Sequence, residues 1–491
     1  MKEKSVKEQL ASGVFYTAIA KYSGILVMLL ISAILARLIS PSDFGVVAIA
    51  TVLIAFFNIF SDFGIGSAIV QNKELTKVDL SNIFSFTVYL GLAIGLAFFL
   101  ASWLIAWYYK KDILVNVCQL LSVNLFFASV NIVPNGLLLK AKRFKFIAYR
   151  TFCIQLLAGA LSILAAFSGW GVYALLIAPI LTSVALFIIN FAQNPQRFSF
   201  KIRWASLKVI ASYSVYQFLF NFINYFSRNL DKLVIGRYMG MSALGFYDKS
   251  YRLMILPLQN ITHVVTPVMH PLFSDYQKDT AKLSFYYLKI LRLLAFIGFP
   301  LSVLLFFASS ELILIVFGNQ WYDSIPIFRI LSLSVGVQII LSTSGAIFQA
   351  ANSTKNLFLT GVFSAIVNVV GLFIGLFVFG TLNAVAWAFV ITFSINFFQC
   401  YWIMFRIVFK QSLFLFFKEL ISPLIVTIIL VGTLYIVNAL TLDIHMFLSL
   451  VIKILVGGGV TLLYIQFRKE YDVIGIVGHY WGRYIKKNEK E

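Results

Sequence analysis

Charged residues are scarce in this chain of 491 residues. They make up 12% of it, whereas hydrophobic residues make up 60%; a soluble domain carries about a quarter charged residues. So little polar surface could not cover a soluble protein of this length. Because the apolar runs approach the roughly 20 residues that a helix needs to span a bilayer, the sequence predicts an all-α integral membrane protein.

Cysteine and histidine are also rare. The three cysteines, Cys118, Cys153 and Cys400, all lie inside apolar runs, so we expect no disulfide framework. The sequence shows no Cys/His spacing typical of a metal site and no Walker motif for ATP. It therefore predicts no metal, no cofactor and no direct use of ATP.

The apolar runs predict about fourteen transmembrane helices. A basic leader, MKEKSVKEQL, precedes a first run that is too long for the core of a signal peptide. Between the ninth and tenth runs, ELILIVFGNQWYDSIP is expected to form a re-entrant or interfacial turn with Trp321 and Tyr322 at the headgroups. The expected spans are 12–36, 44–68, 83–107, 113–137, 148–168, 171–192, 211–236, 246–269, 288–309, 325–350, 357–379, 382–405, 418–440 and 445–467.

Lysine and arginine fall mostly on one side of the predicted membrane. With the N-terminus in the cytoplasm, the cations on the opposite side are Arg37, Lys110, Lys111, Arg237 and Lys249. The positive-inside rule therefore predicts that both termini are cytoplasmic. This topology accounts for most of the net charge of +20, so no nucleic-acid partner is expected.

One segment of the chain recurs 200 positions later. Residues 35–46 read LARLISPSDFGV and residues 235–246 read IGRYMGMSALGF, and each copy lies between two long apolar runs. The identical pairs are Arg37 and Arg237, Ser42 and Ser242, and Gly45 and Gly245. This repeat predicts two pseudo-symmetric six-helix lobes followed by an additional helix pair and a basic tail, and such two-lobed membrane proteins are mostly transporters. The predicted parts are residues 1–200, 201–410 and 411–491.

Ionisable side chains inside the predicted spans are candidates for function, because each costs at least ~2.5–3.5 kcal/mol on insertion scales. Span one carries Lys21 about one turn after Thr17. Span seven carries a polar stripe at helical spacing. The stripe consists of Gln217, Asn221, Asn224, Arg228 and Asp231, with Lys232 beside it.

Span one and span seven begin the two predicted lobes, so we expect their polar faces to line one hydrated cleft. Positive charge from Lys21, Arg228 and Arg252 would suit an anionic ligand, because an arginine is well shaped for phosphate oxygens. The alternatives are a lysine that snorkels to the interface and a structural ion pair between Arg228 and Asp231.

Other charges have more than one interpretation. Asp62 could be a counter-ion for Lys21, a ligand for a coupling ion, or a cap of a broken helix, since FSDFGIG contains two glycines. Asp231 and Lys232 could likewise serve ion coupling or charge pairing. Lys453 lies outside the repeat, and we expect it to be structural or to snorkel.

Three segments make the chain resemble a known family. They are ARLISPSDFGVVAIA, KAKRFKFIAYR and FSRNLDKLVIGRYMGMSALGFYDKSYRLMILPLQN. With them the chain resembles the polysaccharide transporters (Wzx-type flippases) of the multidrug/oligosaccharidyl-lipid/polysaccharide exporter superfamily. The arrangement of Arg228, Asp231, Gly236 and Arg237 is similar to that of the branch of lipopolysaccharide, colanic acid and teichuronic acid exporters.

The resemblance implies a V-shaped, two-lobed protein of the bacterial cytoplasmic membrane. It would flip an undecaprenyl-diphosphate-linked oligosaccharide to the outer leaflet by alternating access, for O-antigen, capsule or exopolysaccharide assembly. Lys21, Arg228 and Arg252 would bind the pyrophosphate, while the amide side chains of the stripe would contact the sugar or water. Partners would be the lipid-linked substrate, the bilayer and, in addition, the polysaccharide polymerase or export machinery.

Other functions remain open at this point. A multidrug or other small-molecule exporter of the same superfamily would share the lobes, but its cleft should have an acidic or apolar bias. A peptidoglycan-precursor flippase would move a similar headgroup. A membrane glycan polymerase or ligase needs a sizeable outward catalytic loop or paired carboxylates, and the predicted outward loops are short. We therefore expect a transporter and not an enzyme.

Overall fold

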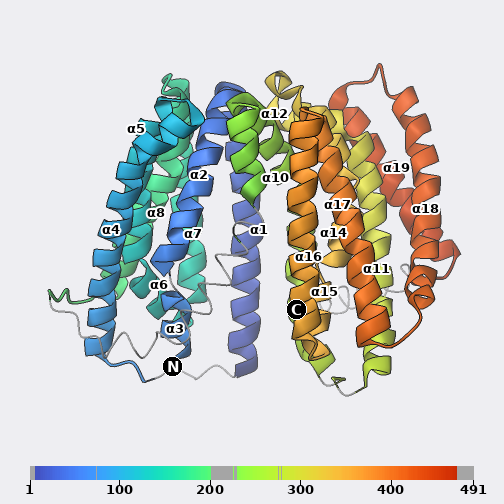
Figure 1. The fold of residues 1–491 in the computed structure, drawn as a ribbon, viewed down its shortest axis with the longest axis horizontal. Helices are drawn as coiled ribbons and strands as arrows, with labels where there is room; N and C mark the ends of the chain where they lie inside the picture. The colour runs from blue at the N-terminus through green and yellow to red at the C-terminus, as the bar shows by residue number, and fades with distance from the viewer. Residues whose placement is uncertain are drawn as a thin grey trace, which may run out of the picture. The chain divides into compact units, whose positions relative to one another are not determined.

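The computed structural model describes residues 6–62, 64–72, 74–200, 225, 229–274, 276–277 and 279–472; for residues 6–21, 62, 263–268, 270–272 and 274 it describes the backbone only. Within these ranges the regular structure is helical and includes no strand (Figure 1), which confirms the predicted all-α fold. The physical reason is that a bilayer offers no water to backbone polar groups, whereas a helix satisfies its own.

Ten of the described helical segments are long and apolar enough to cross a membrane, or eleven if one bent pair counts as a single span. The two halves of that pair, Ser324–Ser332 and Val335–Ala350, meet at 47°. The protein is therefore a multi-pass membrane protein, but the expected count of about fourteen is not confirmed. Residues 211–224 and 226–228 of the expected seventh span, 211–236, lie outside the described ranges, and the first span contributes only the shorter apolar segment Tyr22–Leu38.

The contacts within the chain divide it into two compact units, which we call unit 1 (Met1–Asp248) and unit 2 (Lys249–Glu491). Residues 229–238 of unit 1 are helical, and α10 (Met241–Ser274) begins in unit 1 and ends in unit 2. The other described helices of unit 1 are α1 (Val6–Leu38), α2 (Pro41–Asp62), α3 (Ile65–Gln71), α4 (Lys77–Tyr109), α5 (Ile113–Val130), α6 (Ile132–Lys140), α7 (Phe144–Phe167), η1 (Gly171–Tyr173) and α8 (Ala174–Gln193).

The predicted domain boundaries at residues 200 and 410 stay predictions.

Unit 2 contains longer helices and several short ones. The helices of unit 2 after α10 are α11 (Thr280–Phe307), α12 (Ser309–Phe317), η2 (Asn319–Trp321), α13 (Ser324–Ser332), α14 (Val335–Leu341), α15 (Ser344–Ala350), α16 (Thr354–Phe373), η3 (Ile374–Val378), α17 (Leu382–Trp402), η4 (Ile403–Val408), α18 (Leu413–Leu440) and α19 (Met446–Phe467).

Two expected spans of unit 1 are broken into a long and a short helix. Between α2 and α3 lies Gly64, whose φ of 73° is in the left-handed region that suits glycine. The break between α5 and α6 is at Asn131. The short helices α3 and α6 pack together, and a Cβ added at Gly136 would lie 3.4 Å from the Ile69 side chain. The first of these two breaks lies in the FSDFGIG segment, directly after Asp62.

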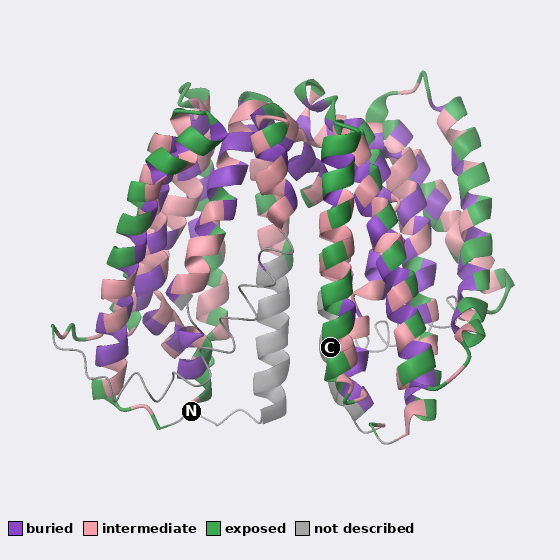
Figure 2. Cartoon of the chain, in the orientation of Figure 1, coloured by how far each residue is buried: buried purple, intermediate pink, exposed green. Residues whose placement is uncertain are grey.

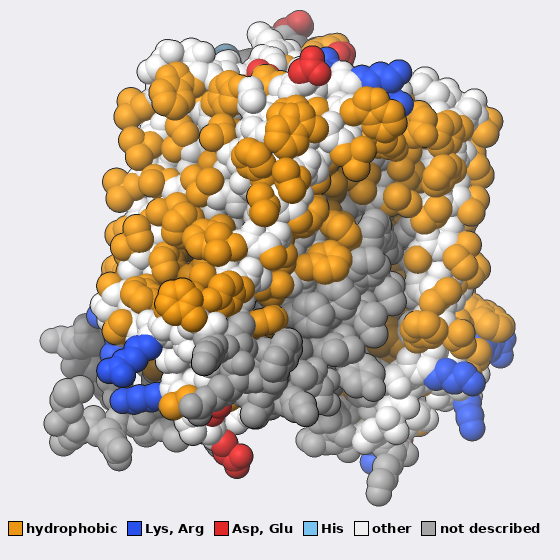
Figure 3. Space-filling view, turned by 60° about the vertical axis from the view of Figure 1, so that its left-hand side comes forward, with side chains coloured by type: hydrophobic (Ala, Val, Ile, Leu, Met, Phe, Trp, Pro, Cys, Tyr) orange, Lys and Arg blue, Asp and Glu red, His pale blue; other side chains and the backbone are white. Residues whose placement is uncertain are grey.

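The helices bury small residues against one another and expose large apolar side chains. On α4, Gly91 and Gly95 face α5, and a Cβ added at Gly91 would lie 2.8 Å from the Ser129 Cβ. Leu92 and Leu96 of the same helix are more than half exposed. Exposed residues run along α4 and α18 (Figure 2), and apolar side chains cover the middle of the face shown in Figure 3, with charged ones near its edges. Such a surface suits contact with lipid tails.

The two copies of the repeated segment meet where α2 and α10 begin. A Cβ added at Gly45 would lie 1.8 Å from the Met241 carbonyl oxygen, and one added at Gly245 would lie 2.0 Å from that of Pro41. Positions 41 and 241 are themselves 200 residues apart, so the contact is the same from both sides. Only glycine lets the two helix starts approach this closely, and this explains why both matched positions hold it.

Candidate functional site

Most residues predicted to line a cleft are not described at the level of their side chains. Lys21 and Thr17 lie on α1 and Asp62 ends α2, but only their backbones are described. Four members of the span-seven stripe lie outside the described residues: Gln217, Asn221, Asn224 and Arg228. The common cavity and the ion pair within the stripe therefore stay predictions.

Asp231 is the member of the stripe that the structure describes, and it is buried in unit 1 with 6% of its surface exposed. It lies in the helical segment 229–238, and Tyr247 of α10 donates its hydroxyl to Asp231 Oδ2 at 2.7 Å. Asp231 Oδ1 has no hydrogen-bond partner in the described part of the chain. A buried carboxylate oxygen that makes no hydrogen bond to the described residues can accept a proton or bind a small cation.

Lys232, the next residue in sequence, forms an ion pair with Asp248 of α10. Its Nζ lies 2.8 Å from Asp248 Oδ1, and both side chains are nearly buried. Each charge alone would carry a large desolvation cost at this depth, and the pair offsets part of it. Lys232 therefore makes a charge pair in the structure, while a role in ion coupling stays a prediction.

Arg252, the third predicted cation, lies four residues after Asp248 on α10. Its side chain is exposed, and by position it belongs to unit 2. Its predicted contact with a pyrophosphate stays a prediction, and the exposed guanidinium leaves such a contact sterically possible.

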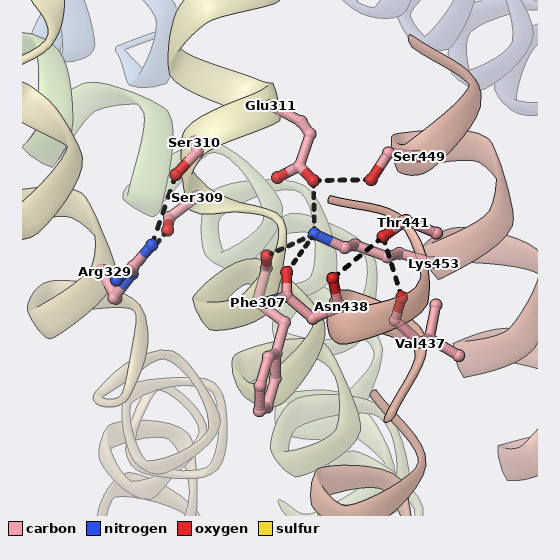
Figure 4. Close-up of polar contacts among 10 residues, drawn as sticks. All are labelled: Phe307, Ser309, Ser310, Glu311, Arg329, Val437, Asn438, Thr441, Ser449 and Lys453. Carbon is pink, nitrogen blue, oxygen red and sulfur yellow. Dashed lines mark hydrogen bonds and ion pairs between the residues drawn. The ribbon is translucent and has the colours of Figure 1, made fainter. Parts of the chain in front are cut away.

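A second buried charge cluster lies in unit 2 and is centred on Lys453 of α19 (Figure 4). The Lys453 ammonium forms an ion pair with Glu311 of α12 and donates to Asn438 Oδ1 of α18 at 2.7 Å. It also donates to the Phe307 carbonyl oxygen at 3.0 Å, and Ser449 Oγ donates to Glu311 Oε1 at 2.8 Å. Lys453 is thus held by protein groups and does not snorkel, which supports the structural interpretation of this residue.

The other end of α18 and α19 carries a matching network. Arg292 of α11 forms ion pairs with Glu419 of α18, at 3.2 Å, and with Glu470, which follows α19. Ser422 Oγ donates to Glu470 Oε1 at 2.6 Å. Tyr471 packs beside these charges, and burial raises the pKa of its hydroxyl against the opposing charge of Arg292. Ion pairs therefore hold α19 to α12 at one end, and they hold α18 and the residue Glu470 after α19 to α11 at the other end.

The turn between α11 and α13 differs from its sequence prediction. Trp321 was expected at the headgroups but is fully buried, whereas Tyr322 is exposed as expected. The Lys249 ammonium lies 5.1 Å from the Phe317 ring centre and 5.7 Å from that of Trp321. Trp321 thus packs inside unit 2 with a cation near its ring face, an arrangement in which the cation and the ring attract each other.

Sequence reasoning missed the acidic partners in these clusters. Asp248, Glu311 and Glu419 lie in or beside apolar runs, in a chain with only 19 acidic residues. An acid in such a place was itself a usable signal, because it needs a partner once it is buried. Among the described residues no group of three or more His, Cys, Asp or Glu side chains could hold a metal ion.

Comparison with known proteins gives one family and several similar chains. The model of a family described as "Polysaccharide biosynthesis protein" matches residues 34–326. The teichuronic acid biosynthesis protein TuaB of Bacillus subtilis (strain 168) is 24% identical over 434 residues, which cover 86% of this chain and 88% of that protein.

Two solved structures show the same fold. The lipid II flippase MurJ in an inward closed conformation has a TM-score of 0.72 at 17% identity, and the match covers 93% of this chain and 99% of that one. An inward-facing multidrug resistance MATE family transporter has a TM-score of 0.58 at 18% identity, with coverage of 76% and 92%. These likenesses establish the fold of the chain, and they include both a flippase and a drug transporter.

Proposed function

The chain belongs to the family of polysaccharide biosynthesis proteins, which confirms the resemblance seen in its sequence, and on that premise we propose that it is a flippase for lipid-linked oligosaccharides. Its substrate is an undecaprenyl-diphosphate-linked oligosaccharide, moved from the cytoplasmic to the outer leaflet by alternating access. One observation carries the proposal: a member of a polysaccharide family is built from membrane-crossing helices. Such a protein can act on the glycan where it must cross the bilayer.

The proposed site handles two polar parts of one amphipathic substrate. Lys21, Arg228 and Arg252 neutralise the pyrophosphate, since Arg and Lys form strong charge-assisted hydrogen bonds with phosphate oxygens. The side chains of Thr17, Gln217, Asn221 and Asn224 provide hydrogen bonds for the sugar or for water. The lipid tail stays outside the polar cavity, against apolar helix surfaces.

Energy coupling is proposed to use a carboxylate. Tyr247 donates a hydrogen bond to one oxygen of Asp231, and the other oxygen has no partner in the described chain. This arrangement supports the binding of a proton or a cation by Asp231. Asp62 is the second candidate, next to the α2–α3 break.

The proposed location is the cytoplasmic membrane of a bacterium, with both termini on the cytoplasmic side. The distribution of Lys and Arg supports this orientation. The product then lies where a polysaccharide polymerase or export machinery can take it up. The chain itself is proposed to catalyse no covalent step.

A small-molecule exporter is the alternative, because the fold is also that of a multidrug transporter. The mostly cationic candidate residues favour an anionic substrate over the organic cations that such exporters commonly carry. A glycan polymerase or ligase is a more remote alternative, for which the described residues offer no support in the form of a long outward loop.

The deciding experiment measures leaflet exposure of a lipid-linked oligosaccharide in proteoliposomes. Lys21→Ala, Arg228→Ala and Arg252→Ala should each slow exposure by about ten- to a hundredfold, because each loses a charged hydrogen bond worth about 1.5–3 kcal/mol. Lys111→Ala removes an exposed cation from the α4–α5 loop and should leave the rate unchanged. A wild-type protein that flips no such lipid but transports an organic cation would establish the exporter instead.

A further inference from the structure

Arg150 is a buried arginine that the proposed site does not use. It lies in the second turn of α7 in unit 1, and 8% of its surface is exposed. A guanidinium stays charged in a protein, so its five N–H groups need acceptors wherever it is buried.

The structure supplies Arg150 with few acceptors. Nη2 donates to Asn135 Oδ1 of α6 at a long 3.4 Å. Nε and Nη1 are shielded from solvent and have no hydrogen-bond partner among the residues that the structure describes. The guanidinium lies 5.9 Å from the Phe146 ring centre, a contact that compensates only partly for the missing acceptors. A buried charge in this state is costly and calls for an explanation, and a bound anion would supply the missing acceptors.

A row of amide side chains continues from Arg150 into unit 1. Asn135 lies one turn after Asn131, which is the residue at the α5–α6 break. Asn190 of α8 is fully buried and donates its Nδ2 to Asn131 Oδ1 at 2.7 Å. Within the described ranges, Asn190 Oδ1 also has no hydrogen-bond partner. Helices α6, α7 and α8 and the α5–α6 break thus contribute polar groups to one interior row. In the described part of the chain, Arg150 has donors and Asn190 has an acceptor that make no hydrogen bond.

The row lies at the same end of unit 1 as several other cations. Lys140 ends α6, and Arg143 and Lys145 stand at the start of α7. The register of α7 with α1 is fixed by Gln155 Nε2, which donates to the Gly24 carbonyl oxygen at 3.0 Å, and by the contact of Gly159 with Ile31. The first turns of α7 therefore lie beside the part of α1 that precedes Gly24. The summed positive charge at this end favours the approach of an anion.

We propose that Arg150, together with the amides of Asn135, Asn131 and Asn190, forms an oxyanion site in unit 1 that binds a phosphate group. The planar fork of a guanidinium can bind two phosphate oxygens at once, and its two unpartnered nitrogens are the donors for such a contact. Asn190 Oδ1 accepts a hydrogen bond from a hydroxyl next to the phosphate or from a water. The origin of this phosphate rests on the proposed function. The phosphate belongs to the diphosphate of the lipid-linked sugar or to an anionic phospholipid.

The test combines stability and binding on the full chain in detergent. Without a ligand, Arg150→Met should raise the melting temperature, because it replaces an incompletely paired buried charge by an apolar side chain of similar length. Addition of inorganic pyrophosphate at constant ionic strength should raise the melting temperature of the wild type in a saturable way. Arg150→Met should lose this shift, and Arg150→Lys should bind at least about tenfold more weakly, since lysine keeps the charge but not the fork.

Arg143→Ala is the matched control, because it removes an exposed guanidinium from the start of the same helix. This variant lowers the summed positive charge that attracts the anion but removes none of the groups proposed to bind it, so a saturable pyrophosphate shift should remain. The proposal is overturned if Arg150→Met lowers the melting temperature of the free protein and keeps the shift, since Arg150 would then be a structural residue. If Arg150→Met does not fold, Arg150→Gln takes its place in the same comparison.

Phosphatidylglycerol added to phosphatidylcholine micelles separates the two sources. A shift with this lipid, dependent on Arg150 and absent with pyrophosphate, assigns the site to a phospholipid headgroup; no Arg150-dependent shift with either ligand overturns the proposal. Flipping is measured in parallel. Arg150-dependent binding by a wild type that flips nothing would refute the proposed function alone, whereas normal flipping and normal binding by Arg150→Met would refute the site alone.

Discussion

Single charges hold the last two helices of unit 2 in place. Lys453 contacts α11, α12 and α18 at one end, and Arg292 contacts Glu419 and Glu470 at the other. A buried pair of this kind is weak evidence for net stabilisation, but removal of one partner leaves an uncompensated charge. The effect of each residue should therefore depend strongly on whether its partner is present.

Lys453→Met should lower the free energy of unfolding of the protein by about 3–5 kcal/mol, because the Glu311 carboxylate is left buried without its cation. The double variant Lys453→Met/Glu311→Leu should recover most of that loss. Thermal unfolding in detergent measures both. Lys418→Met is the control, since Lys418 is exposed on α18. Equal losses in the single and double variants would contradict a coupled pair.

Asp231→Asn tests the proposed coupling site. The amide can keep the hydrogen bond with Tyr247 but cannot exchange a proton, so flipping should continue down a substrate gradient and lose its stimulation by an ion gradient. Proteoliposome flipping with and without an imposed proton or sodium gradient measures this difference. Asp112→Asn, at an exposed position before α5, should behave like the wild type. Unchanged stimulation in Asp231→Asn would remove this residue from the coupling mechanism.

The residues that sequence alone could identify were those with a pattern. Asp231 and Lys232 stand out because polar residues at helical spacing are rare inside an apolar run. Glu311 could not be matched to Lys453, because the two lie 142 positions apart and nothing local links them. Arg150 lies two residues inside an expected span, where the positive-inside rule alone accounts for its charge. It becomes a candidate site because Nε and Nη1 have no hydrogen-bond partner among the described residues.

At the scale of helices, the long apolar runs predicted where helices lie but not where they break. Expected span 113–137 is divided at Asn131 and expected span 325–350 is bent by 47°. Asn131 has an ordinary right-handed backbone conformation, so it offers no turn signal of the kind that Gly64 gives. The Asn131 side chain accepts a hydrogen bond from Asn190, 59 positions later, and the local sequence around Asn131 cannot predict such a contact.

The crossing of α2 and α10 leads to a paired prediction. Gly45→Ala and Gly245→Ala should each destabilise the protein by about 1–3 kcal/mol, because the new methyl group overlaps a backbone carbonyl that cannot move away easily. Gly361→Ala on α16 is the control, since its Cβ would meet nothing within 4 Å. It should be neutral or stabilising by up to about 1 kcal/mol through helix propensity.

Thermal unfolding of the three variants checks this pair. Similar losses of stability in Gly45→Ala and Gly245→Ala would show that both glycines have the same role, which is to allow the close contact between the starts of α2 and α10. If both variants melted like Gly361→Ala, the close approach of the two helix starts would not exist in the membrane protein.

At the scale of the whole molecule, the charge distribution of the sequence supports one topology. The loops placed outside carry few cations, whereas the loop at residues 141–143 and the residues after α19 are basic. Because positive charge near a span resists translocation, both termini are expected in the cytoplasm. The family match adds no information on orientation, so this inference depends on charge alone.

Cysteine accessibility tests the topology directly. Cys118 and Cys400 are buried, so Cys153→Ser removes the exposed native thiol and gives a parent variant with little maleimide labelling. In intact cells an impermeant maleimide should label Lys111→Cys and Asp443→Cys, and it should label Ala141→Cys and Lys355→Cys only after the membrane is opened; all four positions are exposed. The reverse pattern would place the basic loops outside. It would also put the cationic end of unit 1, including Arg150, in the leaflet where the proposed substrate leaves and not where it enters.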